Sequence, residues 1–222
     1  MTQVDVKQRI LAANEEAAAH IREGFAASGT LVVNLISSPG SGKTTLLETT
    51  IASLAGRVRL AALEGDIATE RDADRLRRMG IPARQILTGG ACHLDARQIR
   101  GALGEAGFDR PDILLIENVG NLICPTSYDL GEDFKVALLS VTEGDDKPFK
   151  YPAIFARAAV TVITKVDILP YVTFDLDEVR AQVTSLNPAG ELVVTSSRTG
   201  EGIDAWCTLL LDRLAAKRAS AG

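Results

Sequence analysis

The chain has 222 residues, 46% of them hydrophobic, and a formal net charge of −5. This length suits one α/β domain with an additional helix, and the apolar fraction supplies a sizeable core. The acidic balance, without a run of Lys or Arg, argues against a nucleic-acid surface. The first residues lack a basic-then-apolar signal and no stretch reaches membrane-spanning length, so we expect a cytoplasmic protein that binds neither nucleic acid nor membrane.

Strand-like and helix-like segments alternate along the chain, and a helix comes first. Apolar residues at helical spacing predict a helix over residues 4–25, inside an N-terminal helical extension that covers residues 1–29. The strands that we expect are residues 31–36, 58–64, 84–87, 113–117, 135–141, 160–164 and 192–195. The helices that we expect after them are residues 43–54, 68–79, 96–106, 151–157, 176–186 and 203–217. The alternation predicts a single α/β domain over residues 1–222, with a mostly parallel central sheet and helices on both faces.

A glycine-bearing loop follows the first expected strand. Residues 37–45 read Ser-Ser-Pro-Gly-Ser-Gly-Lys-Thr-Thr and open a helix, which is the context of a phosphate-binding loop. Lys43 is expected to reach the β- and γ-phosphates, and Thr44 to offer its hydroxyl to Mg²⁺. Ser37 stands where the usual pattern has Gly. The loop predicts a P-loop NTPase, and the residues that we expect at the phosphates are Gly40, Ser41, Gly42, Lys43, Thr44 and Thr45.

Acidic residues end two of the other expected strands. Glu117 closes residues 113–117, and in P-loop enzymes the carboxylate at that place lies near Mg²⁺ and its water. Asp66 follows residues 58–64 and is expected to contact Mg²⁺ or to position the attacking water. Gly120 is placed to offer a backbone N–H to the γ-phosphate. We therefore expect Lys43, Asp66 and Glu117 to be catalytic, and Thr44, Asp66 and Glu117 to bind Mg²⁺.

A base-reading motif, Thr164-Lys165-Val166-Asp167, stands at the end of another apolar strand. The N1–H and 2-amino groups of guanine both donate, and one carboxylate accepts both bonds, so Asp167 would select guanine over adenine. The aliphatic stem of Lys165 can cover the base. Ser197 lies in a loop that resembles the one supplying a backbone N–H to the guanine carbonyl, with an ordinary helix-capping turn as the alternative. Many GTPases have Asn where this chain has Thr164.

Thiols and an imidazole form a further candidate site. Cys92 and His93 lie on a glycine-flanked turn, and Cys124 follows Gly120 in the loop expected at the γ-phosphate. Thiolate and imidazole suit Zn²⁺ and Ni²⁺, and in a parallel sheet both loops would emerge at the nucleotide edge. Two inert thiols and a capping histidine are the alternative. Cys207 sits in an apolar helical pattern and is expected in the core.

These motifs together resemble the HypB family, P-loop GTPases that deliver nickel during the maturation of nickel–iron hydrogenases. The stretches that carry the resemblance are SSPGSGKTTLLE, EGDIATERDADR, GGACHLDA, ENVGNLICPTSYDLGE, LSVTEGDDKPFKYP and TKVDILPYV. The resemblance implies GTP/GDP and Mg²⁺ binding, hydrolysis of GTP to GDP and phosphate, and Ni²⁺ or Zn²⁺ at Cys92, His93 and Cys124. It also implies a nucleotide-dependent or metal-dependent homodimer, with hydrogenase-maturation proteins and the hydrogenase large subunit as partners.

Three other functions remain open at this point. A urease-type nickel-delivery GTPase typically has Cys-Pro-His, whereas this chain has Ala91-Cys92-His93. A P-loop small-molecule kinase would share the phosphate loop, but Asp167 and the Cys/His set argue against it. A non-catalytic nickel-binding or structural zinc protein would keep the loop as a relic. The function that we predict is a GTP-hydrolysing metallochaperone.

Overall fold

The computed structural model describes residues 3–66 and 71–220, with residues 3–10 and 71 as backbone alone. Its centre is a seven-stranded sheet in the order β3-β2-β4-β1-β5-β6-β7, and every neighbouring pair is parallel. The strands are β1 (Leu31–Ser37), β2 (Leu60–Asp66), β3 (Ala83–Leu87), β4 (Ile113–Glu117), β5 (Phe134–Ser140), β6 (Val160–Thr164) and β7 (Glu191–Val194). The central strands are buried on both faces, which is why they read as continuous apolar runs.

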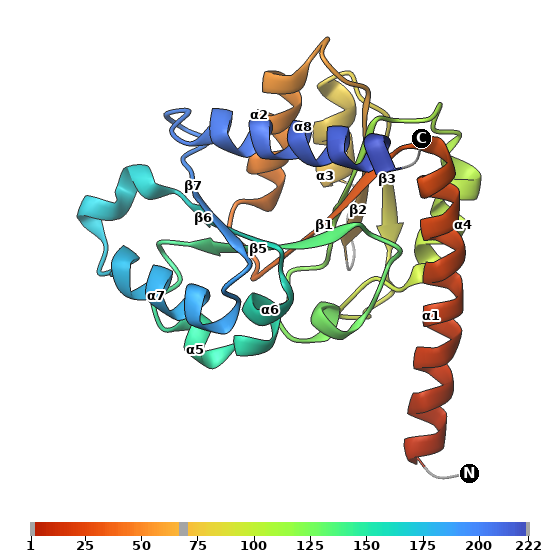
Figure 1. Ribbon diagram of the computed structural model, residues 1–222, viewed down its shortest axis with the longest axis horizontal. Helices are drawn as coiled ribbons and strands as arrows, with labels where there is room; N and C mark the ends of the chain where they lie inside the picture. Colours follow the sequence, from red (N-terminus) through yellow and green to blue (C-terminus); the bar gives the residue numbers. More distant parts are fainter. Residues whose placement is uncertain (1–2, 67–70, 221–222) are drawn as a thin grey trace.

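Helices cover both faces of this sheet, as the sequence predicts (Figure 1). One face carries α2 (Lys43–Leu54), α3 (Arg71–Arg78) and α8 (Ile203–Ser220). The other face carries α1 (Gln3–Ser28), α4 (Ala96–Ala106), α5 (Lys147–Lys150), α6 (Pro152–Arg157) and α7 (Leu176–Leu186). Trp206 of α8 is fully buried in the first layer and donates its indole N–H to Thr50 of α2. Cys207 beside it is buried, as expected.

The expected elements differ from the observed ones mainly at their ends. The structure has the expected bounds for β4, β6, α2, α4 and α7. The expected helix over residues 151–157 is present as α6 and begins one residue later, at Pro152, where the missing N–H of proline costs nothing. The short helix α5 before it was not expected. The expected helix over residues 68–79 begins outside the described residues. Two 3-10 helices, η1 (Cys124–Ser127) and η2 (Val166–Tyr171), were not expected, and both follow residues of the candidate site.

The N-terminal helix α1 lies along α4, and its first turns extend past the rest of the molecule (Figure 1). Ala17, Ala18 and Ile21 are buried in the same apolar cluster as Ile99 of α4. The small alanines let the two helices approach closely. Because α1 packs beside α4, it also reaches the loops at the carboxyl edge of the sheet.

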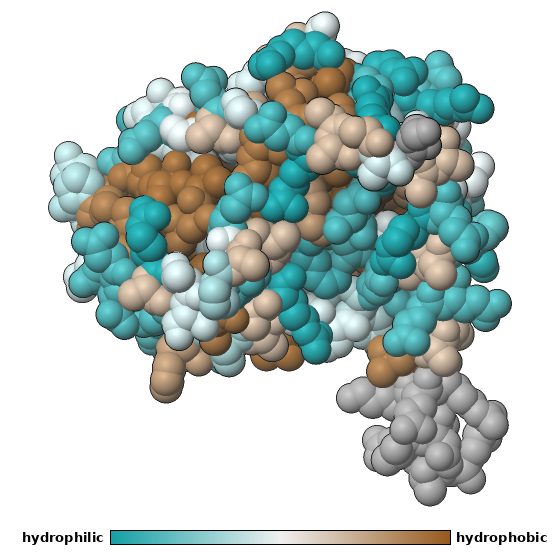
Figure 2. All heavy atoms as spheres, viewed as in Figure 1, coloured by the Kyte–Doolittle hydropathy of each residue, from teal (hydrophilic) through white to brown (hydrophobic). Residues whose placement is uncertain are grey.

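Apolar side chains gather at one edge of the sheet, between α8 and α7 over the β7 edge (Figure 2). Leu192, Val193 and Val194 of β7 are only partly buried there. No helix within the described residues is long and apolar enough to cross a membrane.

Candidate functional site

The phosphate loop connects β1 to α2 at the carboxyl edge of the sheet. Gly42 adopts φ +94° immediately before α2 begins at Lys43, a conformation that favours glycine. The Nζ of Lys43 donates to the Oγ of Ser37 at 2.9 Å, and the Ser37 and Ser41 hydroxyls also bond each other. Ser37, the departure from the usual pattern, therefore holds the lysine ammonium over the loop.

A cavity of about 500 Å³ opens above this loop. Its lining brings together the ends of β1, β2, β4 and β6, which are far apart in the sequence. The expected site residues in that lining are Gly40, Gly42, Lys43, Thr44, Thr45, Asp66, Glu117, Gly120 and Lys165. Ser41 is buried inside the loop, and Asp167 and Ser197 lie outside this cavity.

All three residues expected to bind Mg²⁺, Thr44, Asp66 and Glu117, line the cavity, and two of them contact each other. The Thr44 hydroxyl donates to Oε1 of Glu117 at 3.0 Å. Glu64 is paired in register with Glu117 on the neighbouring strand, and both carboxyl groups are buried. One oxygen of each, Oε1 of Glu64 and Oε2 of Glu117, has no hydrogen-bond partner among the described residues. Hydroxyl and carboxylate oxygens are the donors that Mg²⁺ prefers, so this set fits the ion.

Burial dominates the electrostatics of this carboxyl pair. It raises the pKa of Glu64 well above its usual range, and the neighbouring Glu117 raises it further. Burial also raises the pKa of Glu117, although the Lys43 ammonium opposes that shift. A divalent cation between the two carboxylates would offset both effects.

Gly120 lies directly against the phosphate loop. A side-chain carbon at this position would come within 2.9 Å of Cγ of Pro39, so only glycine fits there. The segment after β4 and the phosphate loop thus touch through backbone. A displacement of one of these two segments would therefore move the other.

The expected base-reading residues lie next to the cavity, at the end of β6. Lys165 has φ +61° and donates its Nζ to the carbonyl of Gly40 at 2.6 Å. The Thr164 hydroxyl donates to the carbonyl of Ser41 at 2.6 Å. Thr164, which stands where many GTPases have Asn, therefore ties the base-reading strand to the phosphate loop.

Asp167 lies in the first turn of η2 and is held by the loop after β7. The Ser196 hydroxyl donates to its Oδ1 at 2.6 Å, and a guanidinium nitrogen of Arg198 lies 4.0 Å from its Oδ2. Ser196 is buried, whereas Ser197 is only partly buried. The structure therefore places the Ser196–Ser197 loop beside Asp167, as a base-reading pair would require.

The three candidate metal ligands come together. One ligand atom of each of Cys92, His93 and Cys124 lies within 4.8 Å of the others. A hydrogen bond with Cys124 raises the pKa of the Cys92 thiol, with burial adding to the shift, and burial lowers the pKa of His93. Thiolates and a neutral imidazole suit Ni²⁺ or Zn²⁺, although a tetrahedral site needs a fourth ligand.

Asp95, the acidic residue nearest to this cluster in the chain, has another role. Its Oδ1 accepts the backbone N–H of Gln98 at 2.8 Å, while the Gln98 side chain accepts the N–H of Asp95. This reciprocal capping box starts α4. The Asp95 carboxylate therefore caps the N-terminus of α4.

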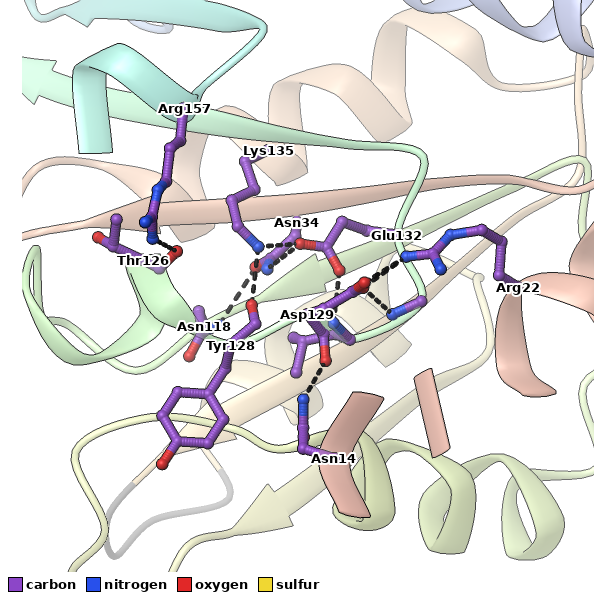
Figure 3. A network of polar contacts seen from close by, with 12 residues as sticks. Asn14, Arg22, Asn34, Asn118, Thr126, Tyr128, Asp129, Glu132, Lys135 and Arg157 are labelled. Atoms are coloured by element: carbon purple, nitrogen blue, oxygen red, sulfur yellow. Dashed lines mark hydrogen bonds and ion pairs between the residues drawn. The ribbon is translucent and has the colours of Figure 1, made fainter. Parts of the chain in front are cut away.

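One asparagine connects the nucleotide cavity to the metal cluster. Asn118 follows Glu117, and its Oδ1 accepts the N–H of Leu94 at 3.1 Å, immediately after His93. Its Nδ2 donates to Asn34 of β1 at 3.2 Å, and this contact belongs to a wider network of polar contacts (Figure 3). The turn that carries Cys92 and His93 is thus bonded to the strand end that carries the Mg²⁺ candidate.

Several residues of the site were not among those expected from the sequence. Glu64 could have been found, because it alternates with Asp66 along the same strand. Arg75 lines the cavity and is held by Glu48 at 2.7 Å, and Tyr128 packs its ring 3.9 Å from that of His93. These two residues and Asn118 lie in stretches that carry the family resemblance, but their roles depend on which segments meet in space.

Comparisons with known proteins agree with this geometry. The family described as "CobW/HypB/UreG, nucleotide-binding domain" matches residues 31–194. The hydrogenase maturation factor HypB of Escherichia coli is 49% identical over 207 residues, which are 93% of this chain and 71% of that protein. The crystal structure of HypB from Archaeoglobus fulgidus has a TM-score of 0.86 at 43% identity, covering 92% of this chain and 100% of that one. The structure of Helicobacter pylori HypB in complex with nickel has a TM-score of 0.87 at 40% identity, covering 94% and 97%.

Proposed function

The chain belongs to the CobW/HypB/UreG family and, within it, to the HypB hydrogenase maturation factors; on this premise we propose that it is a GTP-hydrolysing metallochaperone that delivers nickel to a hydrogenase precursor. The observation that carries the proposal is the joining of two sites at one sheet edge. The phosphate-loop cavity and the Cys92, His93 and Cys124 cluster meet through the hydrogen bond between Asn118 and Leu94.

The cavity has the groups that GTP hydrolysis requires. Lys43 and the loop N–H groups stabilise the negative charge that spreads over the transferring phosphoryl group. Thr44 and Glu117 would hold Mg²⁺ beside the phosphates, where the ion would neutralise negative charge. Asp66, at the end of β2, orients the water that attacks the γ-phosphorus, and the bond to the GDP oxygen breaks. The products are GDP and inorganic phosphate.

Asp167 makes the site specific for guanine. Its carboxylate accepts from the base N1–H and 2-amino group, while Ser196 holds it in place through Oδ1. Ser197 follows Ser196 directly in the chain, so its backbone N–H lies near Asp167 and would donate to the guanine carbonyl. Lys165 covers the face of the base with its aliphatic stem.

The metal cluster gives nickel, as cargo, a place near the nucleotide. It supplies three ligands, so a second copy of the chain or water completes the coordination. Two copies that face each other across their nucleotide edges would bring two ligand sets together, which makes a homodimer the expected delivery form. A hydrogenase-maturation protein or the hydrogenase large subunit would then receive the metal in the cytoplasm.

The test measures nucleotide turnover and metal content in the same preparation. The expected result is phosphate release from GTP in preference to ATP, nickel bound through the cluster, and a dimer mass that depends on the GTP analogue or nickel. Adenine preference with phosphoryl transfer to a small molecule would indicate a kinase instead. Metal binding without turnover, in the presence of the recipient protein, would indicate a structural metal protein.

A further inference from the structure

Asn14, on the N-terminal helix, bonds both segments that carry the candidate metal ligands. Its side chain is buried, with 3% exposed. Its Oδ1 accepts the N–H of Ala96 at 2.8 Å, where α4 starts soon after His93. Its Nδ2 donates to the carbonyl of Asp129 at 2.8 Å, just beyond the η1 segment that begins at Cys124 (Figure 3). One amide group therefore bonds both the segment that follows His93 and the segment that follows Cys124.

The other hydrogen bonds to these segments fix each of them separately. Asn118 bonds the Cys92–His93 side, through Leu94. On the Cys124 side, Arg157 donates to the carbonyl of Thr126 at 3.1 Å and Lys135 to that of Tyr128 at 2.7 Å (Figure 3). Within the described part of the chain, Asn14 is the side chain whose hydrogen bonds reach both segments.

A change in the spacing of the segments would also move the imidazole. Tyr128 lies between Cys124 and Asp129 in the sequence. The centre of its ring is 3.9 Å from the centre of the His93 ring. The position of Asp129, set by Asn14, is therefore transmitted to both Cys124 and His93.

We propose that Asn14 is a positioning residue for the metal site: by bonding Ala96 and Asp129 it sets the separation of Cys92 and His93 from Cys124. The inference rests on the proposed function, since it takes these three residues as metal ligands. It adds that the ligand geometry is set from the N-terminal helix, outside the fingerprint motifs of the nucleotide site.

Asn14→Leu tests the proposal, because leucine is close to asparagine in size and makes neither hydrogen bond. Loss of a partner that orients metal ligands costs about 10-fold in affinity. We therefore expect nickel affinity, measured by competition with a chelator, to fall about 10-fold, and the thiolate-to-nickel absorption band to shift. GTP affinity should not change. Unaltered nickel affinity and spectrum would overturn the proposal.

Arg22→Ala is the matched control. Arg22 also connects α1 to Asp129, through an ion pair of 2.6 Å between half-exposed side chains, but it does not bond the Cys92–His93 side. Exposed ion pairs contribute little, so nickel affinity should stay within about 2-fold of the parent. An equal loss in Arg22→Ala and Asn14→Leu would mean that the general attachment of α1 matters, and not the two hydrogen bonds of Asn14.

A double-variant cycle separates positioning from plain destabilisation. In a Cys124→Ala background the second segment no longer carries a metal ligand. Asn14→Leu should therefore leave the residual nickel affinity unchanged. The same fold-change in both backgrounds would overturn the proposal. If the parent protein binds no nickel through the cluster, the proposed function fails first; if it binds nickel and Asn14→Leu binds equally well, only this inference fails.

A measurement on the parent protein does not depend on the folding of any variant. If the two hydrogen bonds of Asn14 increase nickel affinity, then by linkage bound nickel must stabilise those hydrogen bonds. Hydrogen exchange at the Ala96 amide should therefore slow about 10-fold when nickel binds. The Gln98 amide, bonded to Asp95 in the same helical turn at 2.8 Å, is the matched reference and should slow less. Equal slowing of both amides would contradict the positioning role of Asn14.

Discussion

The phosphate loop and the candidate metal cluster lie at the same sheet edge but are built in opposite ways. The loop is one continuous stretch whose own backbone and hydroxyls shape it, as with Ser37 and Lys43. The metal cluster joins a turn after β3 to a segment after β4, and the side chains of Asn14, Asn118 and Tyr128 hold it from outside.

This contrast shows where each function is vulnerable. A contiguous site is organised as soon as its strand and helix form, so substitutions elsewhere should leave it working. A site assembled from separate segments depends on every contact that sets their spacing. The two regions should therefore respond differently to substitution, except where Asn118 joins them.

The largest effect should come from Lys43→Ala. It removes the fixed positive charge over the β- and γ-phosphates, and loss of one such group costs at least about 100-fold in turnover. Phosphate release should fall by that factor, GTP binding should weaken strongly, and nickel affinity of the nucleotide-free protein should not change. Lys150→Ala, an exposed lysine paired with Asp146, is the control. Turnover at the parent rate would remove Lys43 from the mechanism.

The reverse experiment is Cys124→Ala. Since it deletes one of three ligands, nickel affinity should fall at least about 100-fold, the upper end of what orienting partners alone cost. GTP affinity should be retained and the nickel-induced dimer lost. Cys207→Ala, at a buried residue of α8, should leave the nickel stoichiometry unchanged. Full nickel binding in a Cys92 and Cys124 double variant would place the metal elsewhere.

Asp167→Asn examines the far end of the nucleotide site. The amide donates where the carboxylate accepted, and a mismatched buried bond costs ~1–3 kcal/mol, roughly 5- to 150-fold in GTP affinity. Xanthine has a carbonyl in place of the guanine 2-amino group, so XTP should gain affinity while nickel binding stays the same. A competition assay between the two nucleotides measures this. Unchanged GTP affinity would show that Asp167 does not contact the base.

Asn118→Ala tests the hydrogen-bonded connection between the regions. In the parent protein, nickel affinity should differ about 10-fold between the GDP and GTP-analogue states, and nickel should change nucleotide affinity by the same factor. Removal of the bond to Leu94 should bring that ratio close to one, as calorimetry in each nucleotide state would measure. Equal nickel affinity in both states of the parent would mean that the two regions act independently.

The smallest effect is expected from Asp112→Asn, at the opposite edge of the sheet. Burial opposes ionisation there, but bonds from Arg59 and Arg218 lower the pKa of Asp112 to about 2. Because the folded pKa lies below the unfolded value near 4, the stabilisation is complete above pH 4 and is lost as the pH falls towards 2. After allowance for solvent screening of the arginines, it amounts to about 1 kcal/mol.

Denaturant unfolding at pH 7 and at pH 2 measures this effect. The variant should be less stable than the parent at pH 7 and equally stable near pH 2, with GTP and nickel affinities unchanged at pH 7. A constant difference across that range would mean that the carboxylate charge contributes nothing to folding.

Local pattern was enough to predict most of the architecture. Buried parallel strands read as apolar runs, and helices read as amphipathic stretches with caps, so β4, β6 and α4 have the expected bounds. The candidate guanine motif is readable too, because Thr164 to Asp167 are consecutive. Local pattern failed at η1, which starts at Cys124 and is held by distant partners such as Arg157.

The sequence by itself determined the α/β fold and the phosphate loop, since both follow from the order of neighbouring residues along the chain. Only the tertiary structure decided that Glu64 faces Glu117 and that Asn14 bonds both Ala96 and Asp129. Strand register and helix packing bring such residues together, and no spacing in the chain encodes them. The cluster of Cys92, His93 and Cys124 lies between these cases: its residue types were legible, but their closeness is a product of the fold.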